Sequence, residues 1–259
     1  KYKYIPYQRL FRRTEFLTVP KFGKFEGIAN RNSLQYRGIY GLEDIPTLYR
    51  GTLRRVGYSK AWNVFVQLGM TDDTYIMENT QNMSYREFVN SFLPYSPSDS
   101  VELKLRHNLK IDQDDLIWEK LLELDLFNPE KTIGLEKATP AQALQKILED
   151  QWILQPDDKD MIVMYHKFGY ELNGKKQQID STMVSIGEDQ TYTAMAKTVG
   201  LPVGMATLKI LNGDITRKGV LRPIYPDVYN PILKDLEEYD IKFNEHEVEY
   251  LGYNVDNVN

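Results

Sequence analysis

The sequence predicts an α+β protein in which one α/β domain is interrupted by a small all-helical domain. Residues 1–80 and 155–259 show strand-like alternation and glycine-containing turns, whereas residues 81–154 read as consecutive helices separated by prolines. The junctions near 81 and 155 are rich in Asn, Thr and Gln or in Pro and Asp, as linkers tend to be. We therefore assign residues 1–80 and 155–259 to a mixed-sheet α/β domain and residues 81–154 to a helical insert.

The first part of the α/β domain is predicted to consist of strands and loops with one helix. Residues 22–29 look extended, and residues 47–54 alternate well enough for a strand. Ser59 is a favourable N-cap for a helix over 60–68, and Gly69 would end that helix. The apolar face that we expect this helix to bury is formed by Trp62, Phe65 and Val66.

The insert is predicted to hold four helices. The first begins with Ser84-Tyr85-Arg86-Glu87, a pattern typical of a capping box. The last begins at Thr139, with Pro140 at the first helical position, where proline is favoured. The predicted helices cover 84–93, 100–109, 112–124 and a range starting at 139.

The α/β pattern resumes near residue 159. Residues 161–165 form an apolar run of strand length, and residues 165–172 and 175–186 flank Asn173-Gly174, a strong signal for a two-residue hairpin. Two helices are then predicted on either side of Gly200-Leu201, and a last helix leads into a strand. These elements are expected at 191–199, 202–211, 227–239 and 241–248.

The composition excludes several classes of protein. The chain has 259 residues, of which 42% are hydrophobic and 27% charged, as in ordinary folded soluble proteins. A net charge of -5 argues against the basic face of a nucleic-acid-binding protein, and the apolar runs fall short of the roughly 20 residues that cross a bilayer. Without cysteine there are no disulfides, thiol catalysis or cysteine zinc sites. We expect a cytoplasmic protein with no nucleic-acid or membrane partner.

Common cofactor and catalytic motifs are missing. The sequence has no Gly-x-Gly-x-x-Gly fingerprint, no P-loop and no Gly-x-Ser-x-Gly. Its three histidines lack a second ligand at metal spacing, so no metal site is predicted. His166 follows an apolar strand; we expect a structural role for it, with contact to an anionic ligand as the alternative.

Two short arginine motifs carry most of the chemical information. They are Asn30-Arg31-Asn32-Ser33 and Arg50-Gly51-Thr52-Leu53-Arg54. Arginine binds carboxylates through two parallel hydrogen bonds, and here it lies beside small polar residues. The pattern is typical of a carboxylate clamp, although a loop-capping or surface ion-pair role stays open. The candidate binding residues are Asn30, Arg31, Ser33, Arg50, Gly51 and Thr52.

Together with longer motifs in the same order, these segments resemble the saccharopine dehydrogenase (saccharopine reductase) family. The resemblance covers most of the chain. The further segments are the tryptophan-bearing helix ending Leu68-Gly69-Met70, DMIVMYHKF at 160–168, YTAMAKTVGLP at 192–202, residues 211–220 and YNPIL at 229–233.

The resemblance implies a three-part enzyme: a Rossmann-type cofactor domain, an α/β substrate-binding and dimerisation domain, and a helical domain. This chain looks like the second and third parts only. It opens on Lys1 without an initiator methionine, so we expect a fragment of a longer protein. The N-terminal Rossmann domain, which would bind NAD or NADP, would precede it and explain the missing glycine fingerprint. A homodimer is also implied.

The family's reaction is an NAD(P)-dependent hydride transfer at the secondary amine of saccharopine, a tricarboxylate amino acid of lysine metabolism. By resemblance, Arg31 binds a substrate carboxylate. The resemblance also implies that Thr52, together with Gly51, contacts the substrate, and that Arg50 does so as well. No acid or base residue is carried over, so no catalytic residue is named, and the fragment alone is expected to be inactive.

Asn32 departs from the family pattern, which usually has aspartate there. The change removes one negative charge beside the clamp and leaves the exact substrate open. Two alternatives therefore stand beside saccharopine oxidation. One is a related reductase of another amino-acid or carboxy-polyamine imine, and the other is a non-catalytic module that kept the fold.

Overall fold

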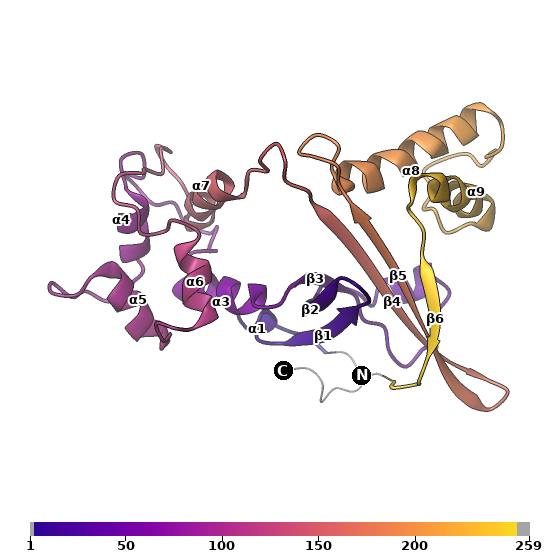
Figure 1. Cartoon of the computed structure of the whole chain (residues 1–259), viewed down its shortest axis with the longest axis horizontal. Helices are drawn as coiled ribbons and strands as arrows, with labels where there is room; N and C mark the ends of the chain where they lie inside the picture. The colour runs from indigo at the N-terminus through magenta and orange to yellow at the C-terminus, as the bar shows by residue number, and fades with distance from the viewer. Residues whose placement is uncertain (1–2, 253–259) are drawn as a thin grey trace. The chain divides into compact units, whose positions relative to one another are not determined.

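Two three-stranded antiparallel sheets and a set of mostly short helices make up residues 3–252, the part of the chain that the computed structural model describes (Figure 1). These residues fall into two compact units. The first unit runs up to Arg31 and continues over Arg50–Ile153; the second consists of Asn32–Tyr49 and the residues from Leu154 onward.

The compact units do not follow all the predicted domain boundaries. The second unit resumes at Leu154, next to the boundary predicted at 155, but residues 50–80 belong to the same unit as the helices that follow them. The reason is that Val64, Phe65 and Met70 are buried in one hydrophobic cluster with those helices. The assignment of residues 1–80 and 155–259 to one domain stays a prediction.

The sheet of the first unit is formed by β1 (Thr14–Val19), β2 (Gly23–Ala29) and β3 (Gly51–Arg55), in the order β1-β2-β3. β2 and β3 agree with the predicted extended segments, although β3 begins later than residue 47. β1 was not predicted. All pairs are antiparallel, as are those of the second sheet. The prediction of a mixed sheet is therefore wrong for the described residues, because their neighbouring strands run in opposite directions.

The helix α3 (Tyr58–Leu68) packs against this sheet and ends at Gly69, which has a left-handed φ of 81°. The predicted N-cap, Ser59, is wrong, since the helix begins after Gly57. The buried carboxylate of Glu26 on β2 accepts the backbone N–H groups of Gly57 at 3.3 Å and Ser59 at 2.5 Å. A side chain from a neighbouring strand thus provides the negative group that a helix N-terminus favours.

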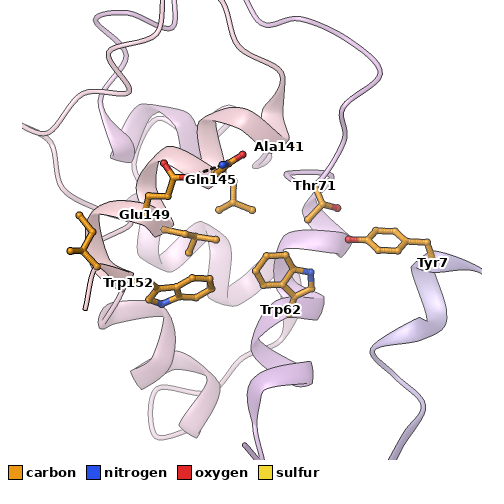
Figure 2. A pocket seen from close by; sticks show the side chains of 10 residues that line it. Tyr7, Trp62, Thr71, Ala141, Gln145, Glu149 and Trp152 are labelled. Carbon is orange, nitrogen blue, oxygen red and sulfur yellow. Dashed lines mark hydrogen bonds between the residues drawn. The ribbon is translucent and has the colours of Figure 1, made fainter. Parts of the chain in front are cut away.

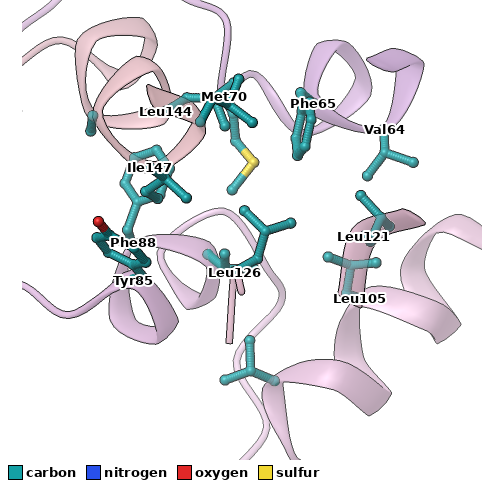
Figure 3. Close-up of a cluster of buried hydrophobic side chains, with 14 of the residues drawn as sticks. Val64, Phe65, Met70, Tyr85, Phe88, Leu105, Leu121, Leu126, Leu144 and Ile147 are labelled. Carbon is teal, nitrogen blue, oxygen red and sulfur yellow. The ribbon is translucent and has the colours of Figure 1, made fainter. Parts of the chain in front are cut away.

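Four helices complete the first unit: α4 (Tyr85–Asn90), α5 (Val101–Leu109), α6 (Leu116–Leu122) and α7 (Pro140–Trp152). The capping box at Ser84 is confirmed, and Thr139 forms a second one with Gln142. These helices and α3 enclose a hydrophobic core (Figure 3). Its largest fully buried side chains include Tyr85, Phe88, Met70, Leu105, Leu121, Leu126, Ile133 and Ile147. The short α1 (Tyr7–Leu10) precedes β1.

A long hairpin dominates the second unit. It consists of β4 (Met161–Leu172) and β5 (Lys175–Ile186), and β6 (Asn244–Val248) pairs with β5 (Figure 1). The predicted turn is confirmed: Asn173 and Gly174 have φ values of 52° and 75°, the left-handed conformation that a type I′ turn requires. The short α2 (Tyr36–Ile39) also belongs to this unit.

A single helix, α8 (Ala194–Leu211), replaces the two helices predicted around Gly200-Leu201, so that prediction is wrong. Pro202 lies inside α8. We attribute the tolerance of proline there to packing, since α8 buries Met205 in a small core with α9 (Pro226–Leu236). A 3₁₀ turn, η1 (Glu237–Tyr239), follows α9.

The continuity of α8 corrects one expectation drawn from the apolar runs. With 18 residues and a mean hydropathy of 1.2, α8 is long and apolar enough, by length and composition alone, to cross a membrane. Only 11% of this stretch is buried, and a single helix of this kind is weak evidence for a membrane span.

Candidate functional site

Five of the six candidate residues meet where β2 and β3 end side by side. Ile28 pairs with Thr52 and Ala29 with Gly51. The pairing continues one residue further, because the backbone N–H of Asn30 donates to the carbonyl of Arg50 at 2.9 Å. Antiparallel pairing thus brings the two arginine motifs, which are about 20 residues apart in sequence, to one end of the sheet.

Strand alternation decides which of these side chains share a face. Directly opposite residues of an antiparallel pair point to the same side, and so do residues two apart on one strand. Asn30, Arg50 and Thr52 therefore lie on the face of Ile28, and all three are half-buried. Ile28 is buried in a cluster with Phe11 and Val66. Asn30, Arg50 and Thr52 form a polar row that begins where this apolar packing ends. The packed cluster around Ile28 therefore holds the strand ends that carry this row.

Arg31 follows directly and has an unusual backbone. Its φ is 25°, outside the regions that non-glycine residues normally occupy. Its side chain is exposed, and no hydrogen bond or ion pair joins its guanidinium to another residue within 3–252. Residues held in such conformations cost of order 1–3 kcal/mol and cluster at functional sites. No sequence pattern indicated this strain. It points to a constraint on the position of the Arg31 guanidinium.

Ser33 is not placed by the strand pairing, since it belongs to the second unit together with Asn32. The Asn32 side chain accepts the backbone N–H of Leu34 at 3.2 Å, a local turn interaction. An aspartate could accept the same bond. Asn32 therefore changes the charge of the motif while leaving its turn chemistry intact.

The other arginines near the two motifs have structural roles. Arg37 donates to backbone carbonyls within residues 42–45, at 3.4 Å and 2.9 Å for two of them. Arg54 and Arg55 lie over aromatic rings, with the guanidinium carbon 5.4 Å and 4.5 Å from the ring centres. Arg37, Arg54 and Arg55 therefore have partners within the protein, and the arginines near the two motifs provide fewer candidate binding residues than their clustering in the sequence suggested.

His166 is packed between rings rather than aimed at a ligand. It stacks on Phe168 at 5.9 Å and contacts Phe243 at 5.4 Å between ring centres. Burial lowers the pKa of its imidazole, which favours the neutral form. This geometry supports the structural role over the anion contact.

Two hollows of the first unit are lined by residues that were not among the candidate binding residues predicted from the sequence. The first, of about 530 Å³, is largely aromatic and apolar, with Trp62 and Trp152 stacked 6.4 Å apart (Figure 2). Its polar rim includes Gln145, which donates to Glu149 at 2.6 Å. The second, of about 710 Å³, lies along α3 and has a polar lining. None of the six candidate residues lines either hollow.

Comparison with known proteins agrees with the resemblance seen in the sequence. Residues 1–241 match the family described as saccharopine dehydrogenase C-terminal domain. The chain is 36% identical to rat mitochondrial alpha-aminoadipic semialdehyde synthase over 225 residues, which cover 85% of this chain and 24% of the relative. It is 30% identical to the Saccharomyces cerevisiae saccharopine dehydrogenase [NADP(+), L-glutamate-forming], covering 85% of this chain and 50% of that protein.

A solved structure gives the same result for the fold. Apo saccharopine dehydrogenase (L-Glu forming) from S. cerevisiae superposes with a TM-score of 0.79 at 27% identity, covering 92% of this chain and 55% of the yeast chain. This chain thus spans about half the length of the yeast protein and about a quarter of the rat synthase. It belongs to the saccharopine dehydrogenase C-terminal domain family.

Proposed function

We propose that this chain is the substrate-binding part of a saccharopine dehydrogenase-like oxidoreductase that acts on a CH–NH bond. The observation that carries the proposal is Arg31, a strained arginine whose guanidinium has no hydrogen-bond or ion-pair partner within residues 3–252, next to the half-buried polar row of Asn30, Arg50 and Thr52. The yeast relative's name describes an NADP(+)-dependent, L-glutamate-forming saccharopine dehydrogenase.

In this proposal the Arg31 guanidinium binds one carboxylate of saccharopine, and the polar row orients the neighbouring part of the substrate. The planar guanidinium offers two parallel N–H donors that match a carboxylate. The strained backbone fixes the point from which the side chain reaches the substrate, so less conformational entropy is lost on binding. Asn30, Thr52 and the backbone at Gly51 offer hydrogen bonds, while Ser33 stays a candidate from resemblance only.

The nicotinamide cofactor, NAD or NADP, is proposed to be bound mainly by a different part of a longer protein. The residues of this chain do not fit a Rossmann dinucleotide site, because no Gly-x-Gly-x-x-Gly follows a strand. The role of this chain in the reaction is accordingly to bind and orient the amino-acid substrate.

The test replaces Arg31 in the full-length enzyme and measures saccharopine oxidation with both cofactors. Removing one partner of a charged hydrogen-bonded pair costs about 2–5 kcal/mol, so Arg31→Ala should lower kcat/KM roughly 30-fold to more than 1,000-fold. Arg9→Ala, an exposed arginine of the same unit, is the matched control and should leave kcat/KM unchanged. Unchanged kcat and KM in Arg31→Ala would refute the assignment.

A second variant separates binding from folding. Arg31→Gly removes the same side chain but tolerates a positive φ, so it should be about 1 kcal/mol more stable than Arg31→Ala and equally inactive. Because Asn32 leaves the substrate open, the wild-type enzyme should also be tested on other amino-acid conjugates and on carboxylated polyamines. Turnover of those alone would indicate the related reductase, and no turnover by a folded protein would indicate a non-catalytic module.

We further propose that the protein forms a homodimer through α8. This helix leaves a set of large apolar side chains exposed in the second unit: Met195, Val199, Val203, Leu208, Ile210 and Leu211. Val203→Glu should weaken the dimer in light scattering of the full-length protein, whereas Asn230→Glu on α9 should not. A monomeric wild type would overturn this proposal.

A further inference from the structure

A row of polar side chains on α3 faces the larger hollow of the first unit. Ser59, Asn63 and Gln67 are spaced four residues apart, so they lie above one another on one face of the helix. All three line the hollow of about 710 Å³, which also borders β1, β2 and the segment between α5 and α6. The polar row therefore forms one wall of this hollow, and other parts of the first unit form the remaining walls.

Two atoms in this row are buried and have no hydrogen-bond partner among the described residues: Ser59 Oγ and Asn63 Oδ1. Ser59 is only 1% exposed, and its own backbone N–H is held by Glu26. Leaving a buried polar atom unpaired costs about 1–3 kcal/mol, so such atoms in a pocket indicate a missing partner.

The charges around the hollow define what that partner should be. The exposed cations Arg12, Lys60 and Lys110 line it, against the single carboxylate of Glu26, and Arg12 Nη2 donates to Gln67 Oε1 at 2.7 Å. That carboxylate already accepts two backbone N–H groups of α3, so it is compensated by the helix terminus. Three cations facing one satisfied anion favour a ligand with more than one negative charge.

We propose that this hollow binds a small dicarboxylate that also carries a hydrogen-bond donor, as amino or hydroxy dicarboxylic acids do. The Ser59 hydroxyl donates to a carboxylate, Asn63 Oδ1 accepts from the ligand's amino or hydroxyl group, and the three cations neutralise its charge. The site is distinct from the Arg31 site, because none of the residues proposed for saccharopine lines it. The ligand bridges α3 and the α5–α6 segment, which would hold these two parts of the unit together.

The experiment compares L-malate with succinate by calorimetry on the full-length protein. These two dicarboxylates differ by one hydroxyl group, the donor that Asn63 would accept. We expect L-malate to bind at least tenfold more tightly than succinate, and to do so equally in wild type and in Arg31→Ala. If binding disappears in Arg31→Ala, the probe occupies the proposed saccharopine site and this inference fails, whereas the proposed function stands.

Three variants complete the test. Asn63→Leu has a similar shape without polar atoms, so it should weaken L-malate binding at least tenfold without lowering the melting temperature. Lys60→Gln should weaken binding of both dicarboxylates, and Lys137→Gln, an exposed lysine of the same unit away from the hollow, should not. Equal affinity for L-malate and succinate, no binding of either at millimolar concentration, or a destabilised Asn63→Leu with unchanged affinity would each overturn the proposal.

Discussion

Gly187 should be irreplaceable by alanine, because a Cβ at this position would lie 2.2 Å from Asp160 Oδ1 and 2.8 Å from the backbone nitrogen of Ala194. The Asp160 carboxylate accepts the N–H groups of Ala194 at 2.5 Å and Met195 at 2.8 Å, and so holds the start of α8. Making room for the methyl group displaces this carboxylate. Losing one charged hydrogen bond costs about 1.5–3 kcal/mol and overpacking about 1–3 kcal/mol, so Gly187→Ala should lose about 3–5 kcal/mol.

The control is the same substitution within α8. Gly200 has no atom within 4 Å of its would-be Cβ, and alanine is a better helix former than glycine. Gly200→Ala should therefore stabilise the second unit by about 0.5–1 kcal/mol. The same glycine-to-alanine substitution is thus expected to lower the free energy of unfolding at Gly187 and to raise it at Gly200.

The assay must report on the second unit alone. All three tryptophans, Trp62, Trp118 and Trp152, lie in the first unit, so tryptophan fluorescence in urea should be the same for both variants. Hydrogen exchange of peptides from 160–200 reports on the second unit. If protection there falls equally in Gly187→Ala and Gly200→Ala, or in neither, the steric argument is wrong.

Two further predictions concern the first unit. Glu26→Gln should lower its stability by about 2 kcal/mol, because an amide N–H₂ cannot accept both backbone N–H groups of Gly57 and Ser59; the urea midpoint by tryptophan fluorescence measures this, with the exposed Glu130→Gln as control. The bidentate pair between Arg86 and Glu102, at 2.6 and 2.7 Å, lowers the pKa of the Glu102 carboxyl chiefly through the hydrogen bonds from Arg86. Because the folded pKa is the lower one, the stability contributed by this pair is complete above the unfolded value of about 4.3 and is lost as the pH falls through the folded value. Glu102→Gln, which keeps the hydrogen bond from Arg86 to the Phe127 carbonyl, should thus cost up to about 1 kcal/mol at pH 7 in chemical denaturation and converge with wild type in acid; a gap that persists below pH 3 contradicts the assignment.

Elements specified by short-range signals were predicted well from the sequence. The capping box at Ser84, the helix start at Thr139-Pro140 and the turn at Asn173-Gly174 depend on residues within a few positions of one another, and all three form. β1 could have been found from the strand formers in its sequence TEFLTV.

Predictions failed where distant residues decide the outcome. Ser59 looked like a cap, but Glu26, 33 positions earlier, holds this helix start, and no local pattern reveals it. Gly200 and Pro202 indicated a break that packing of α8 overrides. At the candidate site the residue types were readable from the sequence, whereas the shared face of Asn30, Arg50 and Thr52 and the strain at Arg31 follow only from the strand pairing.

Folding of the second unit should begin at the β4–β5 hairpin, since a two-residue turn joins its strands and hairpins form within about 1–10 μs. β6 follows α8 and α9 in the chain, so its pairing with β5 must close a far longer loop and lose more chain entropy first. The third strand therefore adds to a ladder that already exists, and during synthesis the hairpin can be in place before the residues of β6 have been made.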